Sequence, residues 1–593
     1  MALLFTILGI GFVLFVHELG HFLAARAAGM RVEVFALGFG PRVWGFRRGG
    51  TDYRLALLPL GGYVLVAGES GTGPPRRGEL MAVGPAWRIL FFSGGILMNL
   101  AFALVLLPIL FAIGVPFESP VIGSVEPGST AWHAGLRSGD RMLDVDGRAT
   151  LGFRHIATAV ALAPENEPVH LRIERDGAVQ QLTVTTEFDS ALGFRRIGVG
   201  PQYEVAPIPG GAAARAGLRD DDDVLAIRGL PVHGVLATQL ALEDAALAEG
   251  PVTLRLRRDG AEMDLRIDPD PPDPASPAQL GVSEQQNRVV AARGDLAGYL
   301  LPGDILRAAG GEPVHRPADL LRAALRAGGL PELEVLRDGA SLTLPALPQV
   351  TPERLSDLLH LGTGPGLRLA VRPGSAADLA GLRDEHAVLR VDDVAVRDFA
   401  ELRRAISDRA GAAAQTPPPE LTLMVMRPGA ADPERLRVTL APLPARDLGL
   451  GLRPVQHVVR SANPLRAVAL GAREAWETVL EVALTLKRIF VGEIAATNLG
   501  GIISIGQVTH GFASQGLIPL LLFLCVISLN LAVLNLLPLP ALDGGHILLV
   551  LIEMVRGKPV GLRARNAFNL VGFAFVIGLL LFVTTLDLRR LLN

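Results

Sequence analysis

The stretch Val16-His17-Glu18-Leu19-Gly20-His21 lies within an apolar segment that runs from Ala2 to Ala25. Residues four apart share one face of a helix, so His17 and His21 could present two imidazole nitrogens to one Zn²⁺ ion, with Glu18 beside them as a general base. A bare His-Glu-x-x-His match also occurs by chance in soluble proteins. Ionisable side chains are costly to place in an apolar membrane segment, and this context favours a functional site.

The composition indicates a membrane protein with several domains. The chain has 593 residues, of which 50% are hydrophobic, and its mean hydropathy is +0.38; this length is too great for a single core. The only cysteine, Cys525, excludes an internal disulfide and a cysteine-based zinc site, so zinc must use histidine and carboxylate ligands. The sequence shows no basic patch with interleaved aromatic residues, which argues against a nucleic-acid partner.

Four transmembrane helices are predicted from the apolar runs, over residues 1–26, 89–115, 517–537 and 567–586. The first lacks the basic start of a signal peptide, so we expect it to be retained. Residues 26–88 contain nine arginines and four acidic residues, which places this stretch in the cytoplasm by the positive-inside rule. We therefore expect a multi-pass inner-membrane protein whose active site lies near the cytoplasmic face.

The cytoplasmic stretch, residues 27–88, has the pattern of a membrane-associated β-hairpin region. Gly38-Phe39-Gly40 and residues 53–66 alternate glycine turns with strand-like runs. A small sheet beside the active site is predicted, and an open strand edge there could bind an extended peptide by strand addition. The alternative is a hairpin that only links two helices.

The middle of the chain repeats itself. Its central glycines are Gly135, Gly217, Gly298 and Gly381, at spacings of 82, 81 and 83 residues. A steady period of this size predicts four copies of one small domain, over residues 117–188, 197–268, 277–347 and 362–443. The Gly-Leu-Arg-x-Gly-Asp pattern resembles PDZ domains, closely in the first copy and loosely in the third. By that resemblance the copies would hold extended peptides on a sheet edge, or else act as spacers.

The C-terminal part supplies a second motif. Residues 462–495 are predicted to form an amphipathic helix along the membrane interface, since they mix charges with apolar residues. Residues 535–546 begin at the inner end of the third span, and with an outside N-terminus the topology puts them at the same membrane face as His21. A catalytic zinc needs three protein ligands, so Asp543 could complete the set. For the Asp-Gly-Gly triplet alone, a helix-capping turn is the alternative.

These motifs together resemble the site-2 protease family of intramembrane zinc metalloproteases, peptidase family M50, and within it the bacterial regulator-of-sigma-E type. The resemblance covers residues 1–140 and 495–593. It implies that His17, His21 and Asp543 are the zinc ligands and Glu18 the catalytic base. It also implies that Asn535 helps to hold the substrate helix, with Gly38, Phe39, Gly40 and Asn99 as further candidate substrate contacts. Asn99 could instead be an interhelical hydrogen-bonding group.

The expected fold is a polytopic α-helical membrane protein with a tandem array of β-rich, PDZ-like domains inserted between the second and third spans. Family members of this type usually have one or two such domains, and four are predicted here. The implied function is regulated intramembrane proteolysis of single-pass membrane proteins that a first protease has already trimmed, such as anti-sigma factors or remnant signal peptides. The array is expected to restrict substrate entry.

Two other functions are compatible with parts of the sequence. A catalytically idle PDZ scaffold could capture membrane-protein tails, although every motif residue is intact. A zinc transporter would need more polar residues in its spans than Asn99 and Asn530.

Overall fold

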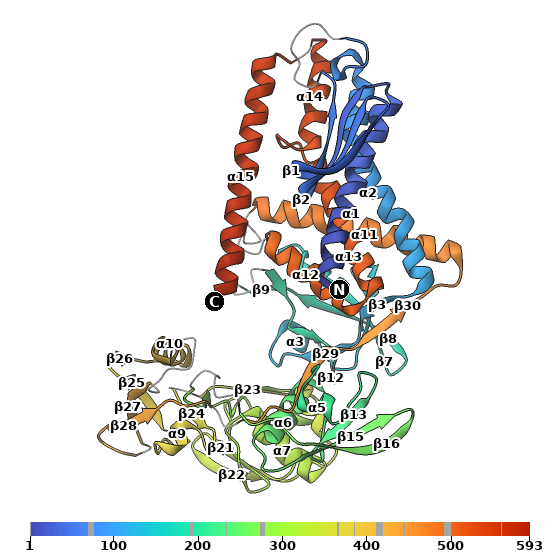
Figure 1. Cartoon of the computed structure of the whole chain (residues 1–593). Helices are drawn as coiled ribbons and strands as arrows, with labels where there is room; N and C mark the ends of the chain where they lie inside the picture. Colours follow the sequence, from blue (N-terminus) through green and yellow to red (C-terminus); the bar gives the residue numbers. More distant parts are fainter. Residues whose placement is uncertain are drawn as a thin grey trace. The chain divides into compact units, whose positions relative to one another are not determined.

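The computed structural model (Figure 1) describes residues 2–68, 76–165, 167–189, 194–232, 234–272, 279–364, 367–384, 386–410, 419–427, 429–442, 445–491, 500–558 and 560–592. The chain divides into two compact units. Unit 1 comprises Met1–Phe117, Phe188–Arg195 and Gln456–Asn593, and unit 2 comprises Glu118–Glu187 and Arg196–Val455. Unit 1 is mainly helical and also contains two-stranded sheets, and unit 2 is rich in strands.

Unit 1 is built on long apolar helices. They are α1 (Ala2–Ala27), α2 (Pro85–Ile113), α13 (Leu517–Leu536) and α15 (Leu562–Leu592). Among the described residues, these four are the helices that are long and apolar enough to cross a membrane, with candidate spans at Leu4–Ala27, Pro85–Ile113, Leu517–Leu536 and Arg563–Leu588. The predicted number of spans is confirmed.

Small residues bring α1 and α2 close together. A Cβ atom added to Gly20 would lie 2.1 Å from the carbonyl oxygen of Gly94, and one added to Gly94 would lie 2.6 Å from that of Gly20. Backbones can approach this closely only where side chains are absent, as is typical of packed membrane helices. The crossing lies beside His17 and His21.

Shorter helices complete unit 1. Helix α11 (Pro464–Val491) covers most of the segment predicted as interfacial and runs across the long helices in Figure 1. Its Gly471 packs against Pro108 of α2, where an added Cβ would lie 2.6 Å from Pro108 Cδ. Helix α12 (Ile502–Gln515) was not expected from the sequence. Asp587 of α15 holds its first turn by accepting from the backbone N–H groups of Gly501, Ile503 and Ser504.

A two-stranded sheet lies between α1 and α2 in the sequence. Strands β1 (Val32–Arg48) and β2 (Thr51–Val66) are long and folded back, so that residues 34–37 pair with 62–65 on one side and with 52–55 on the other. Residues 44–48 pair with 51–55. The register therefore leaves residues 62–66 and 42–48 at the two edges of this sheet.

Unit 2 contains four sheets with the same strand pattern, one for each repeat. Three of the orders are β6-β5-β7-β8, β14-β13-β15-β16 and β26-β25-β27-β28. The third repeat has the same pattern in β20 (Glu312–Pro313), β19, β21 and β22, and its sheet contains two further strands, β18 and β23. These strands are β5 (Arg141–Val145), β6 (Arg148–Ala149), β7 (Pro168–Arg175), β8 (Ala178–Thr185), β13 (Asp223–Ile227), β14 (Leu230–Pro231), β15 (Val252–Arg258), β16 (Ala261–Ile267), β18 (Arg288–Ala292), β19 (Ile305–Ala309), β21 (Leu333–Arg337), β22 (Ala340–Leu344), β23 (Leu359–Gly362), β25 (Ala387–Val391), β26 (Val394–Ala395), β27 (Glu420–Met426) and β28 (Glu434–Thr439). We call the copies repeat domains 1 to 4.

One buried ion pair recurs in three of the copies. Asp140 pairs with Arg175 at 2.6 Å, Asp222 with Arg258 at 2.6 Å, and Asp304 with Arg337 at 2.7 Å. The arginine hydrogen bonds lower the pKa of Asp222 and of Asp304. Repeat domain 4 has His386 at this position, and burial, together with nearby Arg427, lowers the pKa of that imidazole. The fourth copy therefore lacks the shared ion pair.

The four repeat domains are nested within one another in the chain, and the regular spacing of their glycines did not predict this. Strand β12 (Tyr203–Pro207) pairs with β29 (Leu450–Pro454), so the core of repeat domain 2 contains Leu448 from beyond the fourth copy. Strand β17 (Val282–Glu284) pairs with β24 (Leu369–Val371), so Leu280 belongs to the core of repeat domain 4. Repeat domain 3 thus lies in sequence within domain 4, and both lie within domain 2. The range predicted for the second copy therefore omits β29, and the range predicted for the fourth copy omits β17, which falls within the range predicted for the third.

Candidate metal centre

Helix α1 brings the two histidines of the motif together. The Nε2 atoms of His17 and His21 lie 3.2 Å apart, and both residues are buried. Their rings are one helical turn apart and nearly perpendicular, at 82°. Two imidazole nitrogens that converge at this distance can share one metal ion.

Asp543 reaches the same point from a distant part of the chain. Helix α13 ends at Leu536, and α14 (Asp543–Arg556) begins with this residue. Between them Ala541 has a φ of 68°, which a residue with a side chain rarely adopts, and this marks a strained turn in the chain that leads to Asp543. Gly544 must lack a side chain, since an added Cβ would lie 2.3 Å from the carbonyl oxygen of Leu537.

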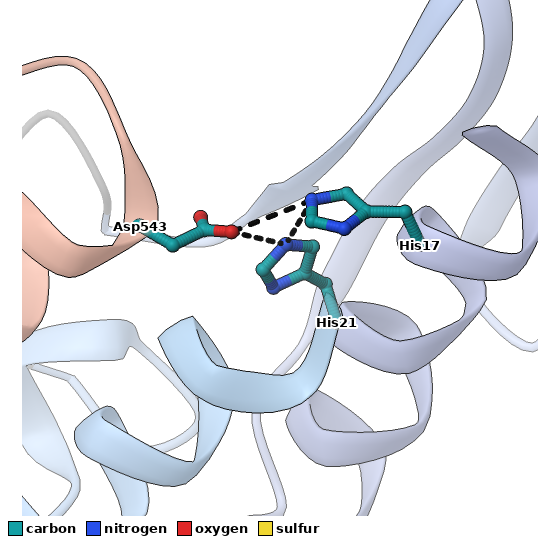
Figure 2. Close-up of side chains that lie close together, drawn as sticks. All are labelled: His17, His21 and Asp543. Carbon is teal, nitrogen blue, oxygen red and sulfur yellow. Dashed lines mark hydrogen bonds and ion pairs between the residues drawn. The ribbon is translucent and has the colours of Figure 1, made fainter. Parts of the chain in front are cut away.

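The three side chains form a small triangle of ligand atoms (Figure 2). Asp543 Oδ2 lies 3.4 Å from His17 Nε2 and 3.4 Å from His21 Nε2. A point equidistant from three atoms at these separations is about 1.9 Å from each, close to the zinc–nitrogen and zinc–oxygen bond lengths of about 2.0–2.2 Å. Asp543 Oδ2 is also buried without a hydrogen-bond partner among the described residues. The donor set therefore fits a tetrahedral zinc ion with one open position.

Helix α2 packs closely against the rings of His17 and His21. A Cβ atom added to Gly95 would lie 2.4 Å from His17 Cε1 and 2.6 Å from His21 Nε2. On the same helix, the carbonyl oxygen of Phe91 lies 2.8 Å from His21 Nδ1. The closeness of Gly95 to the two histidines could not be read from the sequence, because it depends on how α1 and α2 pack.

Glu18 lies beside the sheet. It follows His17 on α1, and a Cβ atom added to Gly62 of β2 would lie 2.8 Å from Glu18 Cγ. Gly62 belongs to the sheet edge formed by residues 62–66. This edge therefore runs next to the carboxylate predicted to be the base.

The predicted substrate contacts fall in different places. Asn535 of α13 is partly exposed, and its Nδ2 lies 3.4 Å from His17 Nε2. Asn99 is completely buried on α2, with Nδ2 at 3.2 Å from His17 Nδ1. This favours the interhelical alternative for Asn99 over a substrate contact. Gly38, Phe39 and Gly40 lie in β1, where Gly38 and Gly40 have φ angles of 85° and 93°.

Charge supports a metal site on α14. Burial alone would raise the pKa of Asp543, yet the two histidines together lower it to about 2, so the carboxylate is ionised at neutral pH. His546, one turn further along α14, stacks on Phe92 with ring centroids 4.8 Å apart. Burial lowers the pKa of His546, which keeps that ring neutral. His546 thus packs α14 against α2 without adding charge.

Comparison with known proteins identifies the family. Residues 5–579 match the sequence profile of peptidase family M50. The chain belongs to peptidase family M50. This M50 peptidase is similar to the regulator of sigma-E protease RseP of Salmonella typhimurium. The two are 26% identical over 593 residues, which cover 98% of this chain and 96% of the relative.

Two further relatives extend this result. The regulator of sigma-E protease RseP of Escherichia coli is 25% identical over 605 residues, covering 98% of this chain and 96% of the relative. A Ralstonia nicotianae protein assigned as a zinc metalloprotease is 25% identical over 612 residues, covering 100% and 99%. This M50 peptidase is therefore a zinc metalloprotease with several membrane-spanning helices.

Proposed function

We propose that the protein is an intramembrane zinc endopeptidase that cuts the transmembrane segments of single-pass membrane proteins. The observation that carries this proposal is the convergence of His17, His21 and Asp543 to within 3.4 Å of one another, with both histidines inside a candidate span. A peptide bond cleaved at this centre would have to enter the helical part of unit 1. The relatives named as regulators of sigma-E suggest anti-sigma factors as one substrate class.

Each residue of the proposed site has its own role in peptide-bond hydrolysis. His17, His21 and Asp543 hold the zinc, which when bound polarises the scissile carbonyl and lowers the pKa of a water molecule to about 7. Glu18 takes the proton from the attacking water and passes it to the leaving amine. Asn535, partly exposed beside His17, contacts the unwound substrate segment.

The sheet edge next to Glu18 offers a way to hold the substrate. Residues 62–66 form one edge of the β1–β2 sheet, and Gly62 lies against Glu18. An extended substrate segment that adds to this edge would pass the catalytic carboxylate with its backbone hydrogen-bonded. We place this sheet and the active site near the cytoplasmic face, and the repeat domains, which we take to be PDZ-like, on the periplasmic side. The repeat domains select substrates from which a first protease has removed the outer domain.

The test is cleavage of a model single-pass substrate by wild type and by Glu18→Gln. We expect cleavage to fall by about 10²–10⁴-fold or more, because the base is lost, while bound zinc stays near wild type. His17→Ala should lose both zinc and activity, since a ligand is removed. Undiminished cleavage by Glu18→Gln would contradict the role of Glu18 as the base. Undiminished zinc in Asp543→Ala would remove Asp543 from the ligand set.

The idle-scaffold alternative predicts a different outcome. A scaffold would bind membrane-protein tails equally well in wild type and in Glu18→Gln, and purified wild type would cleave no substrate. The same assay separates the two functions.

A further inference from the structure

The second ring nitrogen of each zinc-site histidine faces helix α2. His21 Nδ1 lies 2.8 Å from the carbonyl oxygen of Phe91. A carbonyl can only accept, so Nδ1 of His21 carries the hydrogen, and its Nε2 keeps a free lone pair. This Nε2 lies 3.4 Å from Asp543 Oδ2.

The second ring nitrogen of His17 also contacts α2, in this case through a side chain. Its Nδ1 lies 3.2 Å from the amide of Asn99, a residue with no exposed surface. The amide nitrogen occupies the near position and Oδ1 is buried without a hydrogen-bond partner among the described residues. In this orientation Asn99 would donate to Nδ1 and the hydrogen of the His17 ring would sit on Nε2.

That arrangement is incompatible with a metal ligand. A protonated Nε2 would point its hydrogen at His21 Nε2 and Asp543 Oδ2, where the zinc must lie. The nitrogen and oxygen of an asparagine amide are told apart only by their hydrogen bonds, so the two can be exchanged. The exchange breaks no hydrogen bond of Oδ1, because Oδ1 has none among the described residues. The requirement for a free lone pair on Nε2 decides the orientation.

We propose that Asn99 is a positioning residue whose side-chain oxygen accepts a hydrogen bond from His17 Nδ1–H and so presents Nε2 to the zinc. The carbonyl of Phe91 does the same for His21. Acceptors on helix α2 thus fix the tautomer and the ring direction of both histidines. Hydrogen-bond acceptors commonly do this for metal-binding imidazoles. This inference rests on the ligand set proposed above.

The test compares Asn99→Leu with Asn99→Asp. Leucine has a similar volume and cannot accept a hydrogen bond, whereas an ionised aspartate accepts and cannot donate. The measurement is the zinc dissociation constant of the metal-free, detergent-solubilised full chain, by competition with a chelator, together with kcat and KM on a model single-pass substrate. We expect Asn99→Leu to weaken zinc binding by about 10–100-fold. Asn99→Asp should restore it to within a few-fold of wild type, with KM unchanged.

Asn530→Leu is the matched control. Asn530 lies on α13, its Oδ1 is also buried without a partner among the described residues, and no hydrogen bond to His17 or His21 is found for it there. Zinc affinity should stay at the wild-type value in this variant. Weak binding in Asn99→Asp as well as in Asn99→Leu would overturn the acceptor role. Wild-type zinc affinity in Asn99→Leu with a raised KM would make Asn99 a substrate contact.

A separate result would identify failure of the ligand set itself. If His17→Ala keeps full zinc affinity, His17 is not a ligand and the proposed centre is wrong. If His17→Ala loses zinc while Asn99→Leu does not, the centre stands and only the role of Asn99 is rejected.

Discussion

At the scale of single residues, Gly95 sets how closely α2 approaches the ligands. A methyl group there would overlap the rings of His17 and His21, at 2.4–2.6 Å from their nearest atoms. We predict that Gly95→Ala displaces both rings and lowers cleavage by about 100-fold, the usual effect of misplacing a reacting group by about 1 Å. Zinc content should fall with it, as metal analysis of the purified protein would show.

The control for this prediction is Gly11→Ala on α1. An added Cβ at Gly11 has no atom within 4 Å among the described residues, so this variant should keep zinc and activity. Equal activity in both variants would mean that α2 moves away without effect and that Gly95 does not shape the site.

The residue scale also shows what a sequence can predict. The spacing of His17 and His21 and the membrane topology allowed Asp543 to join them, and the family resemblance implied that the three residues form one ligand set. The roles of Gly62 and Gly95 were not predictable, because they depend on how near two backbones come and a glycine carries no chemical signal of that distance. Asn99 was a candidate substrate contact because a polar side chain within a membrane span suggests a function. Its complete burial next to His17 depends on how the helices pack, so the sequence did not predict it.

At the scale of elements, α14 carries Asp543 at its start and Glu553 near its end. Glu553 Oε2 accepts from Arg88 Nη1 of α2 at 2.6 Å, with both side chains at least 90% buried. We predict that Arg88→Met destabilises the protein by about 3–5 kcal/mol, because Glu553 is left buried without its charged partner and keeps, among the described residues, only the hydrogen bond from Val560 N–H. Thermal unfolding in detergent would measure it, and zinc content should fall because the ion pair holds the helix that begins with Asp543.

The matched variant is the double replacement Arg88→Met with Glu553→Leu. An apolar pair of similar volume often replaces a buried ion pair at little cost, so most of the lost stability should return. Failure of the double variant to recover stability would show that the cost came from packing and not from the isolated carboxylate.

Elements were predicted well where composition alone defines them. The long apolar helices are such a case. Helix α12 was missed because residues 502–515 mix small, polar and apolar side chains without a clear period. Its first turn is held by Asp587, which lies more than 80 residues further along the chain. Contacts between distant segments leave no local pattern to detect.

At the scale of the whole molecule, the repeat period predicted four copies but not their nesting. The glycines at Gly135, Gly217, Gly298 and Gly381 mark one turn in each copy, and they do not indicate which distant strands pair with each other. The pairing of β12 with β29 joins segments separated by more than 240 residues (Figure 1). Cutting the chain at the apparent end of the fourth copy would therefore divide repeat domain 2.

This nesting decides how the proposed substrate filter should be tested. Strands β3 (Val115–Glu118) and β30 (Gln456–Val459) pair, and Ser119 N–H donates to the carbonyl of Val455 at 2.7 Å, so a short flexible linker can replace residues 120–454. This deletion also removes Phe188–Arg195 of unit 1, but none of the residues of the proposed zinc site. We predict that the variant keeps zinc and cleaves a substrate whose outer domain is still attached, because the domains that exclude it are gone. Deleting residues 120–445 instead leaves β29 without β12, and an unpaired strand edge favours aggregation, so this variant should express poorly. If the full-length enzyme already cuts intact and trimmed substrates at equal rates, the repeat domains do not select by size, and peptide capture becomes the better account of four copies.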